Sequence, residues 1–138
     1  GIRDQPRSRG LGDVYKRQAE KIELNAIYFD FDKSNIKAEA AFELDKLVQI
    51  MNKYPEMTVS IESHTDSKGP SSYNQRLSER RAKTTSQYVI SKGVDSSRLS
   101  SAGKGESSPV VDCTNCSKEE DQLNRRSEFI ITAGNPGE

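Results

Sequence analysis

Asp66 and Arg81 are the residues whose types and spacing in this sequence are best suited to binding chemistry. Asp66 follows an apolar run typical of a strand, and Arg81 lies in a predicted helix that begins after a Gly-Pro-Ser-Ser loop. Helical spacing places Leu77 and Arg81 on the face that should turn toward the domain. Such a pair suits a ligand with both an ammonium and a carboxylate, because arginine binds carboxylates in a bidentate manner. A simple Asp66–Arg81 salt bridge explains the same residues equally well.

Sequence patterns that indicate catalysis are missing. The chain has no G-x-S-x-G or H-E-x-x-H motif, and no histidine matches either cysteine. His64 is the only histidine, and a hydrogen-bonding role at the end of a strand is the favoured interpretation of it. We therefore expect a binding module that uses no cofactor, and not an enzyme.

Cys113 and Cys116 form a C-x-x-C pair in a polar, loop-like stretch. The pair supplies only two of the four ligands that zinc prefers. A redox-active pair usually opens a helix after a strand, which this context does not resemble. A small structural disulfide in an oxidising compartment is the leading interpretation, followed by a metal site and then by redox catalysis.

Composition limits the classes of function. The chain of 138 residues and 15.4 kDa suits one domain. Its 21 acidic and 21 basic side chains give no net charge, which argues against non-specific binding of nucleic acid. No apolar run approaches the ~20 residues that span a bilayer, so we expect no direct membrane insertion. No signal-peptide core is present either, and we expect the chain to be a fragment of a longer protein.

Hydrophobic periodicity predicts alternating strands and helices. Strands are expected at residues 27–32, 58–63, 99–103 and 126–132. Helices are expected at residues 37–53, at 73–91 with Ser72 as N-cap, and at 118–124. This alternation predicts an α/β two-layer sandwich whose βαβ units have right-handed crossovers.

The two ends of the chain differ from the centre. Residues 1–18 are rich in Arg, Gly and Asp without any period, and they resemble translated adaptor sequence. We expect residues 1–20 to be a disordered non-native or linker segment, residues 21–133 to be the domain, and residues 134–138 to be a tail.

Four motifs together resemble a known family: residues 28–36 (YFDFDKSNI), 64–66 (HTD), 74–82 (NQRLSERRA) and 124–130 (NRRSEFI). In this order and spacing they are similar to the OmpA C-terminal-like family, which includes peptidoglycan-associated lipoproteins and the anchor part of flagellar stator proteins. The resemblance covers residues 27–132. It implies a mixed β-sheet of βαβαβ-type order with helices packed on one face.

The resemblance also implies a ligand, the diaminopimelate in the peptide stem of peptidoglycan. Asp66 would accept its ammonium, and Arg81 would bind its carboxylate as a two-pronged fork. By the same resemblance, the other ligand-binding residues are Asp32, Thr65, Asn74, Leu77 and Arg125. Thr65 and Asn74 would contribute hydrogen bonds and Leu77 an apolar floor, while the remaining two would line the rim.

The function implied is reversible anchoring of the outer membrane, or of an envelope complex, to the cell wall. The location implied is periplasmic, with attachment to the outer membrane in the full-length protein. A periplasmic protein–protein interaction domain that uses the same face is the main alternative. A small metal-dependent enzyme using Asp112, Cys113 and Cys116 is a further one, and a weak homodimer also stays open.

Overall fold

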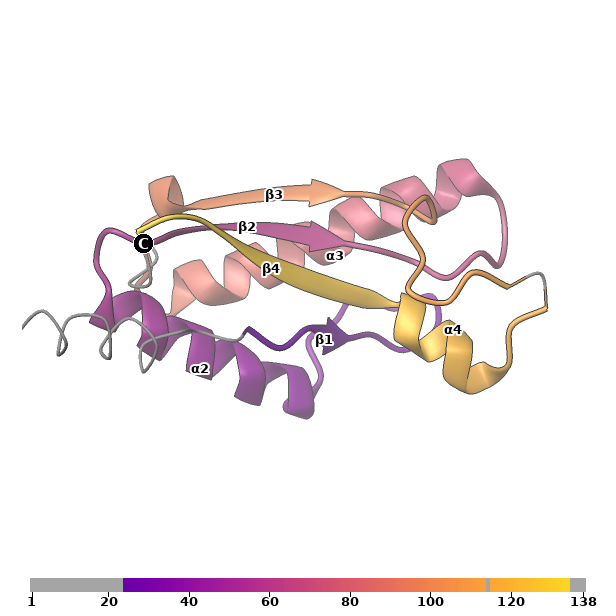
Figure 1. The fold of residues 1–138 in the computed structure, drawn as a ribbon, viewed down its shortest axis with the longest axis horizontal. Helices are drawn as coiled ribbons and strands as arrows, with labels where there is room; N and C mark the ends of the chain where they lie inside the picture. Colours follow the sequence, from indigo (N-terminus) through magenta and orange to yellow (C-terminus); the bar gives the residue numbers. More distant parts are fainter. Residues whose placement is uncertain (1–23, 114, 135–138) are drawn as a thin grey trace, which may run out of the picture.

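The computed structural model describes residues 24–113 and 115–134, so the segment expected to be disordered, residues 1–20, lies outside it. The predicted α/β architecture is confirmed: one mixed sheet is covered on one face by two long helices (Figure 1). The elements are β1 (Ile27–Tyr28), α2 (Ala38–Lys53), β2 (Thr58–Ser63), α3 (Ser71–Ser91), the 3-10 turn η1 (Ser96–Arg98), β3 (Leu99–Gly103), α4 (Lys118–Asn124) and β4 (Arg126–Ala133). None of the helices in these ranges is long and apolar enough to cross a bilayer.

The sheet topology brings distant segments to one edge. The strand order is β1-β4-β2-β3, with β2 parallel to β3 and β4 antiparallel to both of its neighbours. β1 and β2 therefore point in the same direction, although β4 lies between them. Their carboxyl ends lie at the same edge of the sheet, which is also where α3 begins (Figure 1).

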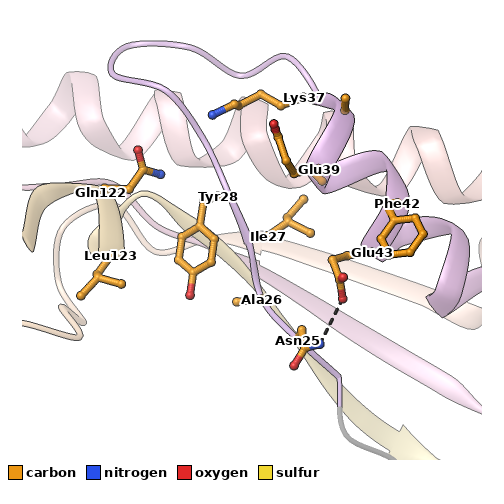
Figure 2. A pocket seen from close by; sticks show the side chains of 12 residues that line it. Asn25, Ala26, Ile27, Tyr28, Lys37, Glu39, Phe42, Glu43, Gln122 and Leu123 are labelled. Carbon is orange, nitrogen blue, oxygen red and sulfur yellow. Dashed lines mark hydrogen bonds between the residues drawn. The ribbon is translucent and has the colours of Figure 1, made fainter. Parts of the chain in front are cut away.

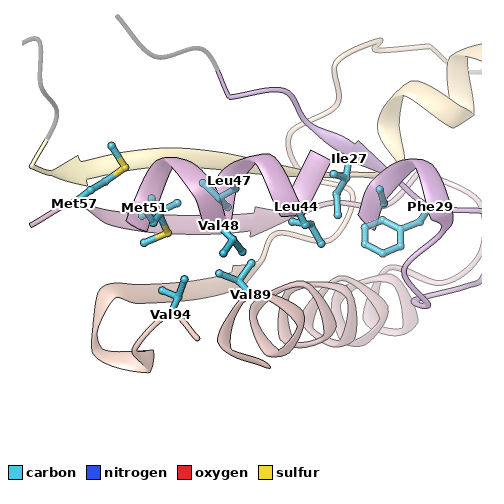
Figure 3. Packing of buried hydrophobic residues seen from close by; sticks show 11 residues of the cluster. Ile27, Phe29, Leu44, Leu47, Val48, Met51, Met57, Val89 and Val94 are labelled. Atoms are coloured by element: carbon cyan, nitrogen blue, oxygen red, sulfur yellow. The ribbon is translucent and has the colours of Figure 1, made fainter. Parts of the chain in front are cut away.

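The core lies between the sheet and α2. The helix buries the side chains that helical spacing predicts: Ala40, Leu44, Leu47, Val48 and Met51. These side chains pack against buried residues of the sheet and of α3, including Ile27, Phe29, Val59 and Val89 (Figure 3). Burial of this apolar stripe fixes α2 on the sheet and leaves the polar edge outside the core.

The buried face of α3 is largely polar. Leu77 and Arg81 are both buried, as their spacing predicts, and Thr85 continues the same stripe. The predicted N-cap at Ser72 is wrong, because the helix begins two residues earlier than predicted and the N-cap position is Pro70, which provides no side-chain cap. Pro70 holds φ at −65° with extended ψ, so the chain turns into the helix directly behind it.

The first strand is much shorter than the alternation predicts. β1 ends at Tyr28, and Phe31, which was expected to face the core, is 58% exposed. Beyond this strand the chain turns at Asp32, which adopts a left-handed conformation with φ of 58°. Beyond the end of β1, the Arg81 guanidinium donates hydrogen bonds to the carbonyls of Asp30 and Lys33.

Candidate functional site

Arg81 is the fixed cation of the polar edge. Its side chain has no solvent-exposed surface, and its guanidinium lies over the Phe29 ring, 5.0 Å from the ring centre. Its donors reach three backbone carbonyls, those of Asp30 (3.1 Å), Lys33 (2.8 Å) and His64 (3.0 Å). Of the five guanidinium N–H groups, one on each terminal nitrogen is left for another acceptor.

Burial sets the electrostatics of this cation. Loss of solvent lowers the pKa of the Arg81 guanidinium to about 10, and the nearby Asp66 carboxylate opposes that change. Arg125 lowers this pKa further, and Asp32 raises it. The guanidinium is therefore still protonated at neutral pH. Its positive charge lies in a buried environment where little water competes for its hydrogen bonds.

Asp66 is the nearby buried carboxylate, with 4% of its surface exposed. Its Oδ2 lies 3.1 Å from Nη1 of Arg125, and its Oδ1 accepts the backbone N–H of Lys68 at 3.1 Å. Within the described residues, no ion pair under 4.0 Å joins Asp66 to Arg81, so the simple salt-bridge explanation is wrong. A carboxylate offers about four lone-pair positions, which leaves capacity for a further donor.

A small pocket of about 20 Å³ opens between these two charges. It is lined by Phe31, Asp32, Asp66, Lys68, Tyr73, Asn74, Leu77, Arg81 and Arg125. The structure thus brings together every predicted ligand-binding residue except Thr65. Thr65 is 3% exposed and does not line this pocket, and its hydroxyl donates to the Asp66 carbonyl at 2.8 Å.

Asn74 holds the loop that carries Asp66. Its Nδ2 donates to the Lys68 carbonyl at 3.0 Å and to Oε1 of Glu106 at 2.8 Å. Asn74 is 2% exposed, and its amide therefore forms its hydrogen bonds mainly with groups of the protein. Leu77, one turn along α3, is 4% exposed and lines the pocket.

Three lining residues, Phe31, Lys68 and Tyr73, are not among the predicted ligand-binding residues. The Tyr73 hydroxyl donates to Oδ1 of Asp32, which fixes the rim carboxylate. Its spacing from Leu77 and Arg81 was a usable signal, because all three fall on one face of a helix. Phe31 was assigned to the core by strand alternation, and only the turn at Asp32 shows that it reaches the rim.

The cysteine loop lies outside this pocket. Cys113 and Cys116 form the predicted disulfide. The loop is fixed to α4 by Asn124, whose Oδ1 accepts the backbone N–H of Val110 at 2.7 Å and of Val111 at 3.1 Å. In this state both sulfurs are bonded to each other, which removes the thiolate ligands that the metal-enzyme alternative requires.

A larger groove runs between β1, the start of α2 and α4 (Figure 2). Its volume is about 840 Å³, and its lining includes Tyr28, Phe42 and Leu123, which are all substantially exposed. One polar contact crosses it, from Nδ2 of Asn25 to Oε1 of Glu43 at 3.1 Å (Figure 2). None of the predicted ligand-binding residues lines this groove.

The α/β fold and the charge-lined pocket at one edge of the sheet are typical of a binding domain. The chain belongs to the OmpA family, whose sequence pattern matches residues 28–125. Outer membrane porin F of Pseudomonas fluorescens is 40% identical over 116 residues, which cover 84% of this chain and 35% of the porin. The peptidoglycan-associated lipoprotein of Rhizobium meliloti is 38% identical over 91 residues, covering 66% of this chain and 52% of the lipoprotein.

The fold has a close counterpart among solved structures. The peptidoglycan-associated lipoprotein from Burkholderia pseudomallei aligns with a TM-score of 0.72 at 24% identity, over 78% of this chain and 89% of the lipoprotein. The chain spans only about a third to a half of the two sequence relatives named above. None of these three relatives is described as an enzyme, and two of them are lipoproteins associated with peptidoglycan.

Proposed function

We propose that this domain binds peptidoglycan non-covalently through the diaminopimelate of the peptide stem, and that it anchors an outer-membrane protein or envelope complex to the cell wall. One observation carries the proposal: the buried Arg81 guanidinium and the Asp66 carboxylate line the same small pocket without pairing with each other. Each charge is thereby available to a ligand group of the opposite sign.

The chemistry of diaminopimelate matches this arrangement. The residue presents a free ammonium and a free carboxylate on one carbon of its side chain. The carboxylate would accept the remaining N–H groups on the two terminal nitrogens of Arg81, and the ammonium would donate to Asp66. Leu77 would contact the methylene chain between the two ends of the ligand, and Asp32 would face the ammonium from the rim.

The pocket is held in position before a ligand arrives. Three backbone carbonyls fix Arg81, and Arg125 together with the Lys68 amide fixes Asp66. A ligand would therefore lose little free energy in ordering these side chains. In the bound state the ligand ammonium would share the Asp66 carboxylate with Arg125.

The relatives support the wider role. One relative is an outer membrane porin, and two are lipoproteins described as associated with peptidoglycan. These relatives agree with the predicted periplasmic location at the outer membrane. A single small pocket would bind one stem with modest affinity, and many copies of the domain on one polymer would add avidity through effective concentration.

A comparison of two stem peptides tests the proposal. One peptide carries diaminopimelate and the other carries lysine at the same position, so that they differ only in the side-chain carboxylate. Calorimetric titration should show at least roughly 30-fold tighter binding of the diaminopimelate peptide, the loss expected when a buried charge lacks its partner. Equal affinities would contradict the role of Arg81. Absence of binding by both peptides would favour the protein–protein interaction alternative.

A further inference from the structure

His64 is buried in an unusual state. Only 2% of the residue is exposed, yet neither Nδ1 nor Nε2 has a hydrogen-bond partner in the part of the chain that the structure describes. The hydrogen-bonding role expected from the sequence is therefore wrong for the side chain, although the backbone N–H and carbonyl are both bonded. An imidazole buried without a partner is costly, and this cost calls for a physical explanation.

Two carboxylates lie beside this ring. Glu62 precedes His64 on the same face of the strand, and Glu128 lies directly opposite Glu62 in the antiparallel register of β2 and β4. Nε2 of His64 is 3.6 Å from Oε1 of Glu128. One ligand atom from each of the three residues lies within 4.8 Å of the other two. Like charges that face each other across two strands are destabilising unless a cation compensates them.

We propose that Glu62, His64 and Glu128 form a binding site for Zn²⁺. One imidazole nitrogen and two carboxylate oxygens form a ligand set that suits zinc, with water in the fourth position. Hard cations such as Ca²⁺ and Mg²⁺ prefer sites made only of oxygen ligands. Metal binding would provide a partner for the His64 ring and would neutralise the facing carboxylates.

The protonation state of His64 agrees with this site. Burial lowers the pKa of the imidazole, and the positive charge of Arg126 lowers it further, whereas Glu128 and Glu62 raise it. The ring is accordingly neutral at physiological pH, which is the form that can coordinate a metal.

Two basic side chains already contact the carboxylates, and neither contact uses the Oε1 atom of Glu128 that lies nearest His64. Arg126 donates from Nε to Oε2 of Glu128 at 2.7 Å, so that Oε1 still faces the histidine. Lys104 lies 4.0 Å from Oε2 of Glu62, and its side chain is 43% exposed. This long contact at the surface contributes little, and a bound metal can displace the lysine.

The site is separate from the proposed peptidoglycan pocket. Glu62 alternates with the buried Ile61 and Ser63, whose side chains face the helices. Arg126 belongs to the same outer cluster and does not line the pocket, whereas its neighbour Arg125 does. The inference therefore stands or falls independently of the proposed function.

Zinc titration of the untagged, disulfide-bonded full chain tests the inference. His64 is the only histidine, so its ring resonances in NMR spectra report directly on this residue. We expect one Zn²⁺ per chain, a shift of the His64 ring resonances, and no competition from equimolar Ca²⁺. His64→Leu should weaken binding by at least about tenfold, as should Glu128→Gln. Lys104→Gln should strengthen binding, and the exposed control Glu119→Gln should leave it unchanged.

Several results would overturn the inference. These are the absence of saturable zinc binding, saturation that leaves the His64 ring resonances unmoved, and equal competition by Ca²⁺. The ring resonances decide the question in the unmodified chain even if a variant fails to fold. A Cys113→Ser/Cys116→Ser variant should bind zinc as the unmodified chain does. Loss of binding in that variant would place the metal at the cysteine loop and would contradict the site proposed here.

Discussion

Arg125 lies 3.1 Å from the Asp66 carboxylate and forms with it the buried ion pair of the pocket. Arg81, the arginine expected from the sequence as the partner, is bonded instead to three backbone carbonyls. The two arginines therefore have different tasks. Arg125 fixes the carboxylate, and Arg81 keeps donors available at the base of the pocket.

Removal of Arg125 should destabilise the folded domain. Arg125→Gln leaves the Asp66 carboxylate with only the Lys68 amide as a partner among the described residues, and breaking a buried pair costs roughly 3 kcal/mol or more. Chemical denaturation should show this loss relative to Arg76→Gln, which alters an exposed arginine of the same helix that carries Arg81. Equal unfolding free energies for the two variants would mean that the Asp66–Arg125 pair contributes nothing to stability.

Arg81→Lys should reduce both stability and binding. An ammonium cannot reproduce the planar fork, so it cannot reach three carbonyls and a ligand carboxylate together. We expect a lower melting temperature and, at a temperature where the variant is folded, roughly 30-fold weaker binding of the diaminopimelate stem peptide or a greater loss. Arg76→Lys is the matched control. Wild-type affinity in a folded Arg81→Lys protein would show that the fork does not contact the ligand.

Local periodicity accounts for much of the site. The spacing of Leu77 and Arg81 predicts their burial on one face of α3, and the end of the apolar run predicts the position of Asp66. The family resemblance adds Asp32 and Arg125, and both line the pocket. These features follow from residues that are close together in sequence or from a motif with fixed spacing.

The pairing of charges could not be predicted in the same way. Asp66 and Arg125 are 59 positions apart, and their contact depends on where β4 inserts into the sheet. The exposure of Phe31 depends on the left-handed turn at Asp32, which alternation does not reveal. The unpartnered ring of His64 likewise depends on which side chains the opposite strand presents to it.

His64 should make the stability of the metal-free domain depend on pH. Because burial lowers the pKa of His64 in the folded state, the unfolded chain binds the proton more readily. The contribution of His64 to stability is present above the unfolded pKa of about 6.5. It is lost as the pH falls from there toward the folded pKa. In chelator-containing buffer, the difference in unfolding free energy between the unmodified chain and His64→Leu should be constant above this window and should change with pH within it. A difference that stays constant throughout would contradict the assignment.

The disulfide should contribute little to stability because it closes a very short loop. Intact mass should be lower by two hydrogens than that of the reduced chain. Cys113→Ser/Cys116→Ser should cost at most about 2 kcal/mol of unfolding free energy, and stem-peptide binding should be unchanged because neither cysteine lines the pocket. Labelling of free thiols in the folded, unreduced protein would contradict the disulfide.

The titration of Asp66→Asn with the diaminopimelate stem peptide tests the central claim most directly. The substitution keeps the shape of the side chain and removes the negative charge that the ligand ammonium needs. Asp45→Asn on the exposed surface of α2 is the matched control, with the same change in net charge. With both variants folded by circular dichroism, we predict that Asp66→Asn weakens binding by about 2–5 kcal/mol, roughly 30-fold or more, while Asp45→Asn binds normally. Equal affinity for the two folded variants would contradict the claim that this pocket recognises the zwitterion of the stem.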